Sequence, residues 1–186
     1  TAQSTAALGR DAAEAIAAAR GLPGQVATLI LPADVSWGEG GQPCPPPAAP
    51  APAAASDEAV QAVAQAIRSG EKTIVLLGGH ALREGALRTA ARIAAHVPQG
   101  GVQLLAEVFP TRMERGAGLP AVERVAYLAE LAGVQLAGAR HLVLVDAKSP
   151  VSFFAYPGKA SDLVPEGCTV HTLCSPAQDA AASLGK

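Results

Sequence analysis

The chain is poor in aromatic residues: among its 186 residues are three phenylalanines, two tyrosines and one tryptophan. So few rings offer little stacking for nucleic-acid bases, and a net charge of −2 gives no basic surface for a phosphate backbone. Long apolar runs are also missing, because none approaches the roughly 20 residues that a membrane-spanning helix needs. The composition therefore indicates a protein that binds neither nucleic acid nor a membrane.

Cysteine is scarce too, with only Cys44, Cys168 and Cys174 and no Cys-x-x-Cys pair. An odd number of cysteines without such a pair argues against a disulfide framework and against a zinc site. We expect reduced thiols and a cytoplasmic location.

Signatures of catalysis are absent as well. The sequence contains no Gly-x-Ser-x-Gly and no His-Glu-x-x-His. Its four histidines are scattered along the chain, at His80, His96, His141 and His171. The sequence therefore assigns no catalytic residue and no metal ligand to this chain.

Residues 1–37 predict one helix followed by one strand. Apolar residues recur at helical spacing over 8–20, and the run VATLIL at 26–31 is typical of a buried parallel strand. One αβ unit cannot bury both faces of its strand, so we expect it to be severed from a neighbouring domain. Because the chain starts at Thr1 rather than at a methionine, we expect an internal fragment of a longer protein.

A linker rich in proline and alanine follows at 38–55, and it separates the first unit from a domain at 56–186. Strands are predicted at 73–77, 102–106, 142–146 and 169–173, with helices at 56–69, 82–96 and 122–137. This alternation predicts an α/β fold with a Rossmann-like open parallel sheet and helices on both faces.

The stretch GGHALREG directly follows the strand predicted at 73–77. Glycines that open a helix are a usual place for backbone N–H groups to hold phosphate. The turn lacks both the Gly-x-Gly-x-x-Gly fingerprint and the P-loop lysine. Two interpretations stay open: a phosphate or sugar site at Gly78, Gly79 and His80, facing a helix that starts near Ala81, or a tight turn alone.

Two more segments are expected at the same rim, since ligands of open α/β sheets settle at the carboxyl ends of the strands. These segments are 109–113 and 146–149. In them Arg112 and Lys148 are placed to meet a phosphate, and Asp146 is placed to accept a hydrogen bond from a ribose hydroxyl.

The segment SPVSFFAYPGKAS holds Phe153, Phe154 and Tyr156, which are half of the aromatic residues in the chain. An apolar loop of this kind either covers its own core or meets another domain or subunit.

Four stretches carry a family resemblance that extends over nearly the whole chain: PGQVATLILPADVSW, AVAQAIRSGEKTIVLLGGHALREGALRTAARIA, LLAEVFPTRMERGAG and GARHLVLVDAKSPVSFFAYPGK. They resemble the large subunit of acetolactate synthase and its homologues among the thiamine-diphosphate-dependent enzymes. By this resemblance, 1–37 is the end of a pyrimidine-binding domain, 38–55 a linker and 56–186 a central domain.

The resemblance implies a parent enzyme that uses thiamine diphosphate and Mg²⁺ to decarboxylate a 2-oxo acid, then ligates or releases the carbanion. The family's catalytic glutamate and Gly-Asp-Gly motif belong to segments outside this sequence. We therefore expect the chain itself to be an inactive scaffold. Its expected partners are the remaining domains of the enzyme, in a homodimer or homotetramer.

In some relatives the central domain also binds FAD or ADP, at positions that match Gly78, Gly79, His80, Thr111, Arg112, Met113 and Asp146, with Lys148 beside them. This sequence departs from the flavin-binding pattern, because His80 replaces a small residue and VDAKSP lacks an arginine. Two alternatives stay open: a stand-alone nucleotide-binding regulatory module and a nicotinamide-dependent oxidoreductase domain.

Overall fold

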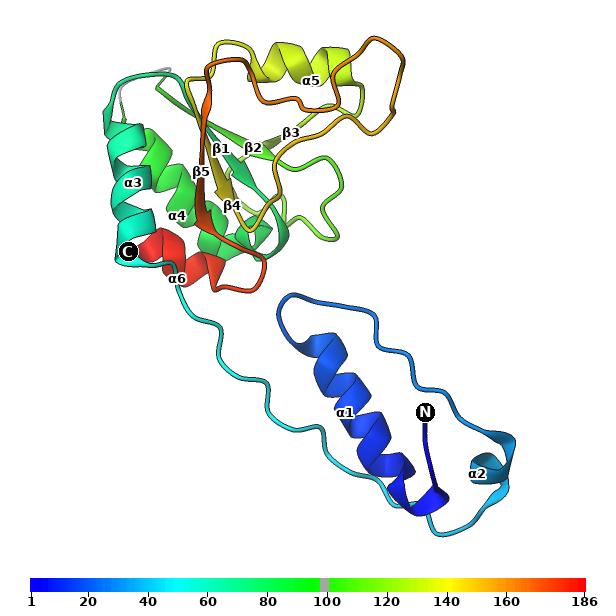
Figure 1. Cartoon of the computed structure of the whole chain (residues 1–186). Helices are drawn as coiled ribbons and strands as arrows, with labels where there is room; N and C mark the ends of the chain where they lie inside the picture. The colour runs from blue at the N-terminus through cyan, green and yellow to red at the C-terminus, as the bar shows by residue number, and fades with distance from the viewer. Residues whose placement is uncertain (98–100) are drawn as a thin grey trace. The chain divides into compact units, whose positions relative to one another are not determined.

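A computed structural model describes residues 1–97 and 101–186. The chain divides into two compact units, Thr1–Pro52 and Ala53–Lys186 (Figure 1). Within the described residues, no helix combines the length and the apolar character that crossing a bilayer requires.

The first unit is built on one long helix. Its elements are η1 (Thr5–Ala7), α1 (Leu8–Arg20) and α2 (Ala33–Trp37). The hydroxyl of Ser4 accepts the N–H of Ala7 at 3.2 Å and so caps η1. The hydroxyl of Thr5 donates to the carbonyl of Val35 at 2.8 Å, which ties α2 to the start of the unit. The helix predicted at 8–20 is confirmed, whereas α2 was not predicted.

The strand predicted at 26–31 is wrong. Residues 1–52, all of which the structure describes, form no strand. The N–H of Ala2 donates to the carbonyl of Ile30 at 2.9 Å, but Val26 is 94% exposed and Ile30 57% exposed. A strand needs a neighbouring strand to pair its N–H and C=O groups, and this unit supplies none. An apolar run alone therefore does not make a strand here.

The second unit contains a five-stranded sheet in the order β3-β2-β1-β4-β5, and every neighbouring pair is parallel. The strands are β1 (Thr73–Leu77), β2 (Val102–Ala106), β3 (Glu123–Arg124), β4 (His141–Val145) and β5 (Thr169–Cys174). The helices are α3 (Asp57–Arg68), η2 (Gly79–Leu82), α4 (Glu84–Ala95), α5 (Ala129–Leu136) and α6 (Ala180–Gly185). The predicted Rossmann-like parallel sheet is confirmed.

The central strand β1 is buried on both faces of the sheet, and its successive side chains point to opposite faces. From β1, Val75 and Leu77 pack into a core with residues of α3, α4 and α6. Ile74 and Leu76 belong to a second core, which α5 helps to form. Figure 1 shows the helices on the two sides of the strands.

Two helices start later in the structure than the sequence predicts. The helix predicted from 82 starts as α4 at Glu84, because the chain first makes the short 3₁₀ turn η2. The stretch 122–137 is helical only from Ala129, because β3 pairs with β2 and the N–H of Val125 donates to the carbonyl of Ala106 at 2.8 Å. Pairing with a neighbouring strand outweighs a modest helix preference in this stretch.

Candidate functional site

The carboxyl ends of β1, β2 and β4 lie together, because these neighbouring strands are parallel and in register. β1 leads into the turn 78–80, β2 into Glu107 and β4 into Asp146. The strand order reverses between β1 and β4, and ligands of open α/β sheets bind at such a point. We call the turn 78–80 with Glu107 and Asp146 the rim, and it is the candidate functional site.

Two carboxylates occupy the backbone N–H groups of the turn. Oδ2 of Asp146 accepts the N–H of His80 at 2.6 Å, and Oε1 of Glu107 accepts the N–H of Gly79 at 3.3 Å. Nδ1 of His80 also lies 3.5 Å from Oδ2 of Asp146, although the imidazole is 57% exposed. The donors that a bound phosphate would use are therefore already bonded to side chains of the protein itself.

The two glycines of the turn make room for these carboxylates. A Cβ on Gly79 would collide with the carboxylate of Asp146, and Gly79 also has a left-handed φ of +39°. A Cβ on Gly78 would collide with the backbone carbonyl of Asp146 and lie 2.8 Å from Oε1 of Glu107. The close approach of the residues after β4 and β2 to the turn thus explains by itself why both positions need glycine.

Both carboxyl groups of the rim have a raised pKa. Burial raises the pKa of Asp146, although the bond from the His80 N–H and the His80 imidazole act in the opposite direction. Burial also raises the pKa of Glu107, and the neighbouring Asp146 carboxylate adds to that rise. The Gly79 N–H and the Lys148 ammonium lower the pKa of Glu107 in part. An incoming anion would first have to displace these two carboxylates from the N–H groups of the turn.

The segment 111–113 does not join the turn. Arg112 pairs with Glu114 of its own loop, with Nη2 3.3 Å from Oε1, and its side chain is 68% exposed. Oε2 of Glu114 accepts the N–H of Glu84 at 2.6 Å, so a carboxylate of the chain bonds to the first residue of α4. The helix expected near Ala81 starts as α4 at Glu84, and its first N–H is bonded to a carboxylate of the chain itself. Thr111 is exposed, and Met113 packs against the core beneath α4.

Lys148 lines a cavity of about 440 Å³ that Glu107 of the rim also lines. The cavity is mostly apolar, with Leu76 and Val125 among its lining residues, and Glu107 reaches it from the rim. Lys148 is exposed and lowers the pKa of Glu107, so it lies near the rim that Gly78, Gly79, His80 and Asp146 help to form.

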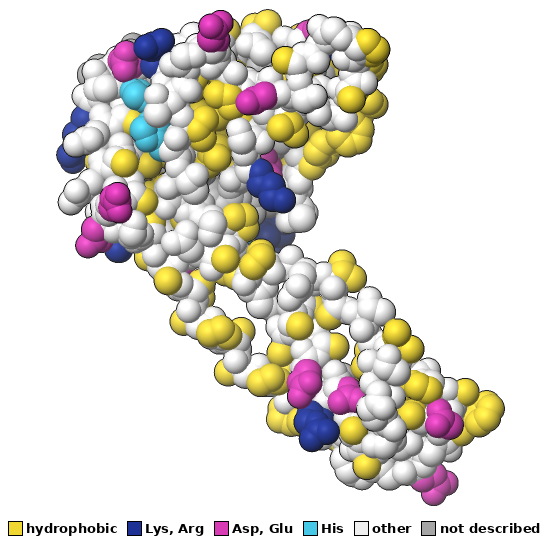
Figure 2. Space-filling view, in the orientation of Figure 1, with side chains coloured by type: hydrophobic (Ala, Val, Ile, Leu, Met, Phe, Trp, Pro, Cys, Tyr) yellow, Lys and Arg dark blue, Asp and Glu magenta, His cyan; other side chains and the backbone are white. Residues whose placement is uncertain are grey.

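Aromatic side chains from three segments form one exposed cluster next to this cavity. Its ring pairs have centroids 4.9–5.8 Å apart and its members are 38–59% exposed. The cluster consists of Phe109, Tyr127, Phe153, Phe154 and Tyr156. Figure 2 shows hydrophobic side chains gathered at the end of the unit where α5 lies. The aromatic loop therefore packs mainly on other aromatic residues and leaves much of its surface open.

Sequence reasoning missed Glu107. The available signal was an acidic residue directly after the strand 102–106, since a carboxylate at the end of a strand beside a glycine turn can reach the N–H groups of that turn. Across the described residues, no group of three or more histidine, cysteine, aspartate or glutamate side chains is placed to hold a metal ion.

Comparison with known proteins confirms the resemblance predicted from the sequence. Over 184 residues, 98% of the chain, the sequence is 54% identical to a Mycobacterium tuberculosis (strain ATCC 25618 / H37Rv) protein described as "Putative acetolactate synthase large subunit IlvX". The fold matches the "X-ray structure of a putative thiamin diphosphate-dependent enzyme isolated from Mycobacterium smegmatis", with a TM-score of 0.68 over 98% of the chain. No family model matches the chain.

The chain spans about a third of the length of these two relatives. It covers 35% of the first protein and 37% of the second. The second match is 19% identical in sequence and so establishes the fold alone.

Proposed function

We propose that this chain forms the structural centre of a thiamine-diphosphate-dependent enzyme of the acetolactate synthase type. The observation that carries the proposal is the 54% identity over 98% of the chain to a protein described as an acetolactate synthase large subunit. In this proposal 1–37 ends a pyrimidine-binding domain, 38–55 is a linker and 56–186 is a central domain. The parent enzyme works in the cytoplasm on a 2-oxo acid, as an oligomer.

The described residues do not fit thiamine diphosphate with its divalent metal ion. They include no group of carboxylate, imidazole or thiolate side chains able to hold a metal. Any residues that bind thiamine diphosphate and Mg²⁺ therefore belong, in this proposal, to other segments of the parent enzyme. The role of the present chain is to support those segments, and we derive no reaction step from its own residues.

A nucleotide site for ADP or FAD at the rim is the second candidate. Its favourable feature is the position of the rim at the reversal of the strand order, beside a cavity of about 440 Å³. Against it, the N–H groups of Gly79 and His80 are bonded to carboxylates that would repel a phosphate. The scaffolding role therefore has the stronger support.

Calorimetric titration with thiamine diphosphate and Mg²⁺ tests the first proposal. We expect no binding to this chain, and we expect cofactor binding and release of CO₂ from pyruvate by the complete parent protein. Stoichiometric micromolar binding to the chain alone would contradict the scaffolding role. A parent reading frame too short for three such domains would instead favour a stand-alone regulatory module or a nicotinamide-dependent domain.

A further inference from the structure

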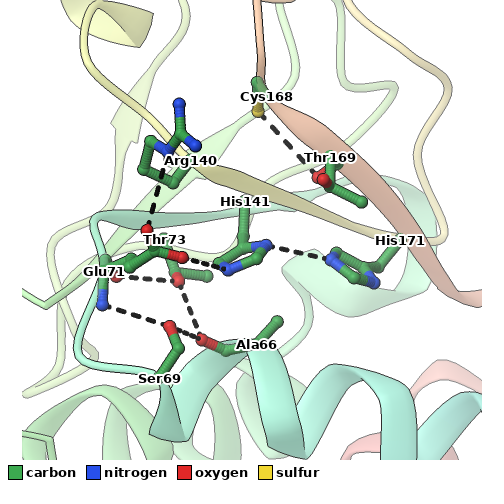
Figure 3. Close-up of polar contacts among 9 residues, drawn as sticks. All are labelled: Ala66, Ser69, Glu71, Thr73, Arg140, His141, Cys168, Thr169 and His171. Atoms are coloured by element: carbon green, nitrogen blue, oxygen red, sulfur yellow. Dashed lines mark hydrogen bonds and ion pairs between the residues drawn. The ribbon is translucent and has the colours of Figure 1, made fainter.

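Two histidines and a glutamate form a chain of hydrogen bonds far from the rim, at the amino end of β4 (Figure 3). Nδ1 of His141 lies 3.2 Å from Nε2 of His171, and Nε2 of His141 lies 3.1 Å from Oε2 of Glu71. His141 is the first residue of β4, and His171 lies in the edge strand β5. The contact therefore joins β5 to β4 and to the loop between α3 and β1.

The hydrogen-bonding capacity of the groups fixes the direction of this chain when both imidazoles are neutral. An ionised carboxylate only accepts, so Nε2 of His141 must donate to Glu71. Nδ1 of neutral His141 is then an acceptor, and Nε2 of His171 must donate to it. One arrangement of protons satisfies all three groups.

The same chain tolerates one added proton but not two. A single proton on either imidazole still leaves one donor and one acceptor at the contact between His141 and His171. When both rings are protonated, every ring nitrogen is a donor, so two N–H groups and two positive charges face each other at 3.2 Å. The bond between the rings is then lost and the contact becomes repulsive.

The Glu71 carboxylate, 3.1 Å from Nε2 of His141, offsets one of the two positive charges, but arginines nearby compete for it or add positive charge. Glu71 is shared with Arg140, whose Nε lies 3.6 Å from Oε1 of that carboxylate. Arg68 ends α3, which packs against β5, and adds another positive charge on that side. Lys72 donates instead to the carbonyl of Ala137, and the Cys168 thiol before β5 has a pKa raised by burial.

We propose that Glu71, His141 and His171 form a proton-operated latch, a side-chain contact that reinforces the backbone pairing of β5 with β4 and is lost when both imidazoles are protonated, so that β5 is held less firmly. Burial, and then the charge of His141, lower the pKa of His171 below its ordinary value. A histidine whose pKa is lowered by folding stabilises the fold fully above its unfolded pKa, and that stabilisation is lost as the pH falls toward the folded pKa. The latch therefore opens on the acid side of neutrality.

Loss of the contact between His141 and His171 is expected to affect β5 and α6 rather than the whole sheet. β5 is an edge strand, with neighbour β4 on one side only, and Val170 within it is 42% exposed. α6 follows β5 and packs against it. Opening of the latch is thus expected to loosen β5 and α6 while β1, at the centre of the sheet, stays protected.

Amide hydrogen exchange of this chain at neutral pH and at about pH 5 tests the latch, after correction for the pH dependence of intrinsic exchange. We expect the protection of β5 to fall several-fold relative to β1 at the lower pH. In His171→Gln the fall should disappear, because a glutamine amide can donate to His141 without titrating. The matched control is His96→Gln at the exposed end of α4, which should behave like the original chain.

Two results would overturn the proposal: equal acid sensitivity of β5 and β1 in the original chain, or an unchanged fall in His171→Gln. If His171→Gln does not fold, NMR titration of the ring protons in the original chain decides the question. Two coupled steps for His141 and His171 support the latch, whereas two independent titrations at ordinary histidine pKa values contradict it.

Discussion

The carboxylate of Asp146 accepts the backbone N–H of His80 at 2.6 Å, and this bond joins the end of β4 to the turn after β1. Asp146 is 5% exposed and has a left-handed φ of +50°, which is uncommon for a residue with a side chain. Its side chain stands where an anionic ligand would meet the turn. The glycines therefore serve contacts within the chain, whatever else the rim binds.

Substitution of Gly79 by alanine should destabilise the second unit. The new Cβ would collide with the carboxylate of Asp146, and alanine would have to adopt a φ of +39°. Backbone strain of this kind costs about 1–3 kcal/mol. Chemical denaturation monitored by circular dichroism measures the loss.

Gly85→Ala is the matched control for Gly79→Ala. Gly85 lies in α4, and a Cβ there would meet nothing within 4 Å. Alanine should raise the free energy of unfolding by up to about 1 kcal/mol, the difference between glycine and alanine in the middle of a helix, because Gly85 is in the first turn of α4. Equal changes in the free energy of unfolding for Gly79→Ala and Gly85→Ala would disprove the tight packing inferred at Gly79.

Four of the five strands could be predicted from the sequence, because each is a short run of apolar or β-branched residues, and the central strand β1 is the clearest. All five residues of β1 are buried, and TIVLL has no polar face to suggest any other element. The helix start at Ser56 was equally clear, since its hydroxyl accepts the N–H of Ala59 at 3.2 Å. Patterns set by a few neighbouring residues are visible in one sequence.

The carboxylate-filled rim could not be predicted in the same way. Glu107 and Gly79 are far apart in the sequence, and their bond depends on which strands become neighbours in the sheet. The stretch 122–128 was misassigned for the same reason, because the pairing of β3 with β2 is not encoded in its local composition. The chain of Glu71, His141 and His171 likewise depends on three distant segments.

Glu107→Gln should stabilise the second unit at neutral pH. Because folding raises the pKa of Glu107, the folded state binds more protons than the unfolded state between the two pKa values. Stability of the original chain therefore falls as the pH rises through that window, and glutamine removes this fall while keeping an oxygen for the Gly79 N–H.

Thermal melting of the original chain and Glu107→Gln across acidic to neutral pH measures this difference. The difference in melting temperature between Glu107→Gln and the original chain should shrink as the pH falls below the ordinary pKa of glutamate. Glu166→Gln, at an exposed position, is the control and should change little at any pH. A variant less stable than the original at neutral pH would contradict the prediction.

Ser183→Ala should loosen the start of the second unit. Ser183 is 2% exposed, its hydroxyl accepts the N–H of Ala55 at 2.8 Å, and it donates to the carbonyl of Asp179. Alanine leaves a buried N–H without an acceptor, which costs about 1–3 kcal/mol. Denaturant unfolding should show this loss, and Ser161→Ala, at an exposed position, should not.

The rim itself is tested by thermal shift with ADP and with FAD. We expect neither nucleotide, at millimolar concentration, to raise the melting temperature of the original chain, because Asp146 and Glu107 occupy the N–H groups of the turn. The double variant Asp146→Asn with Glu107→Gln removes the negative charge at nearly constant shape. Stabilisation by ADP in this variant alone would show that the two carboxylates exclude the phosphate.

A rise in the melting temperature of the original chain with ADP or FAD would show that the rim binds a nucleotide after all. The variant Arg112→Ala then tests whether Arg112 contacts the phosphate. Arg112 pairs with Glu114 in the structure, and it would have to leave that carboxylate to reach a phosphate. A charge-assisted hydrogen bond contributes roughly 1.5–3 kcal/mol, so its loss should weaken binding about ten- to a hundredfold. Stabilisation that is present in the original chain and lost in Arg112→Ala would establish a nucleotide site at the rim. Stabilisation that survives the substitution would place the phosphate elsewhere.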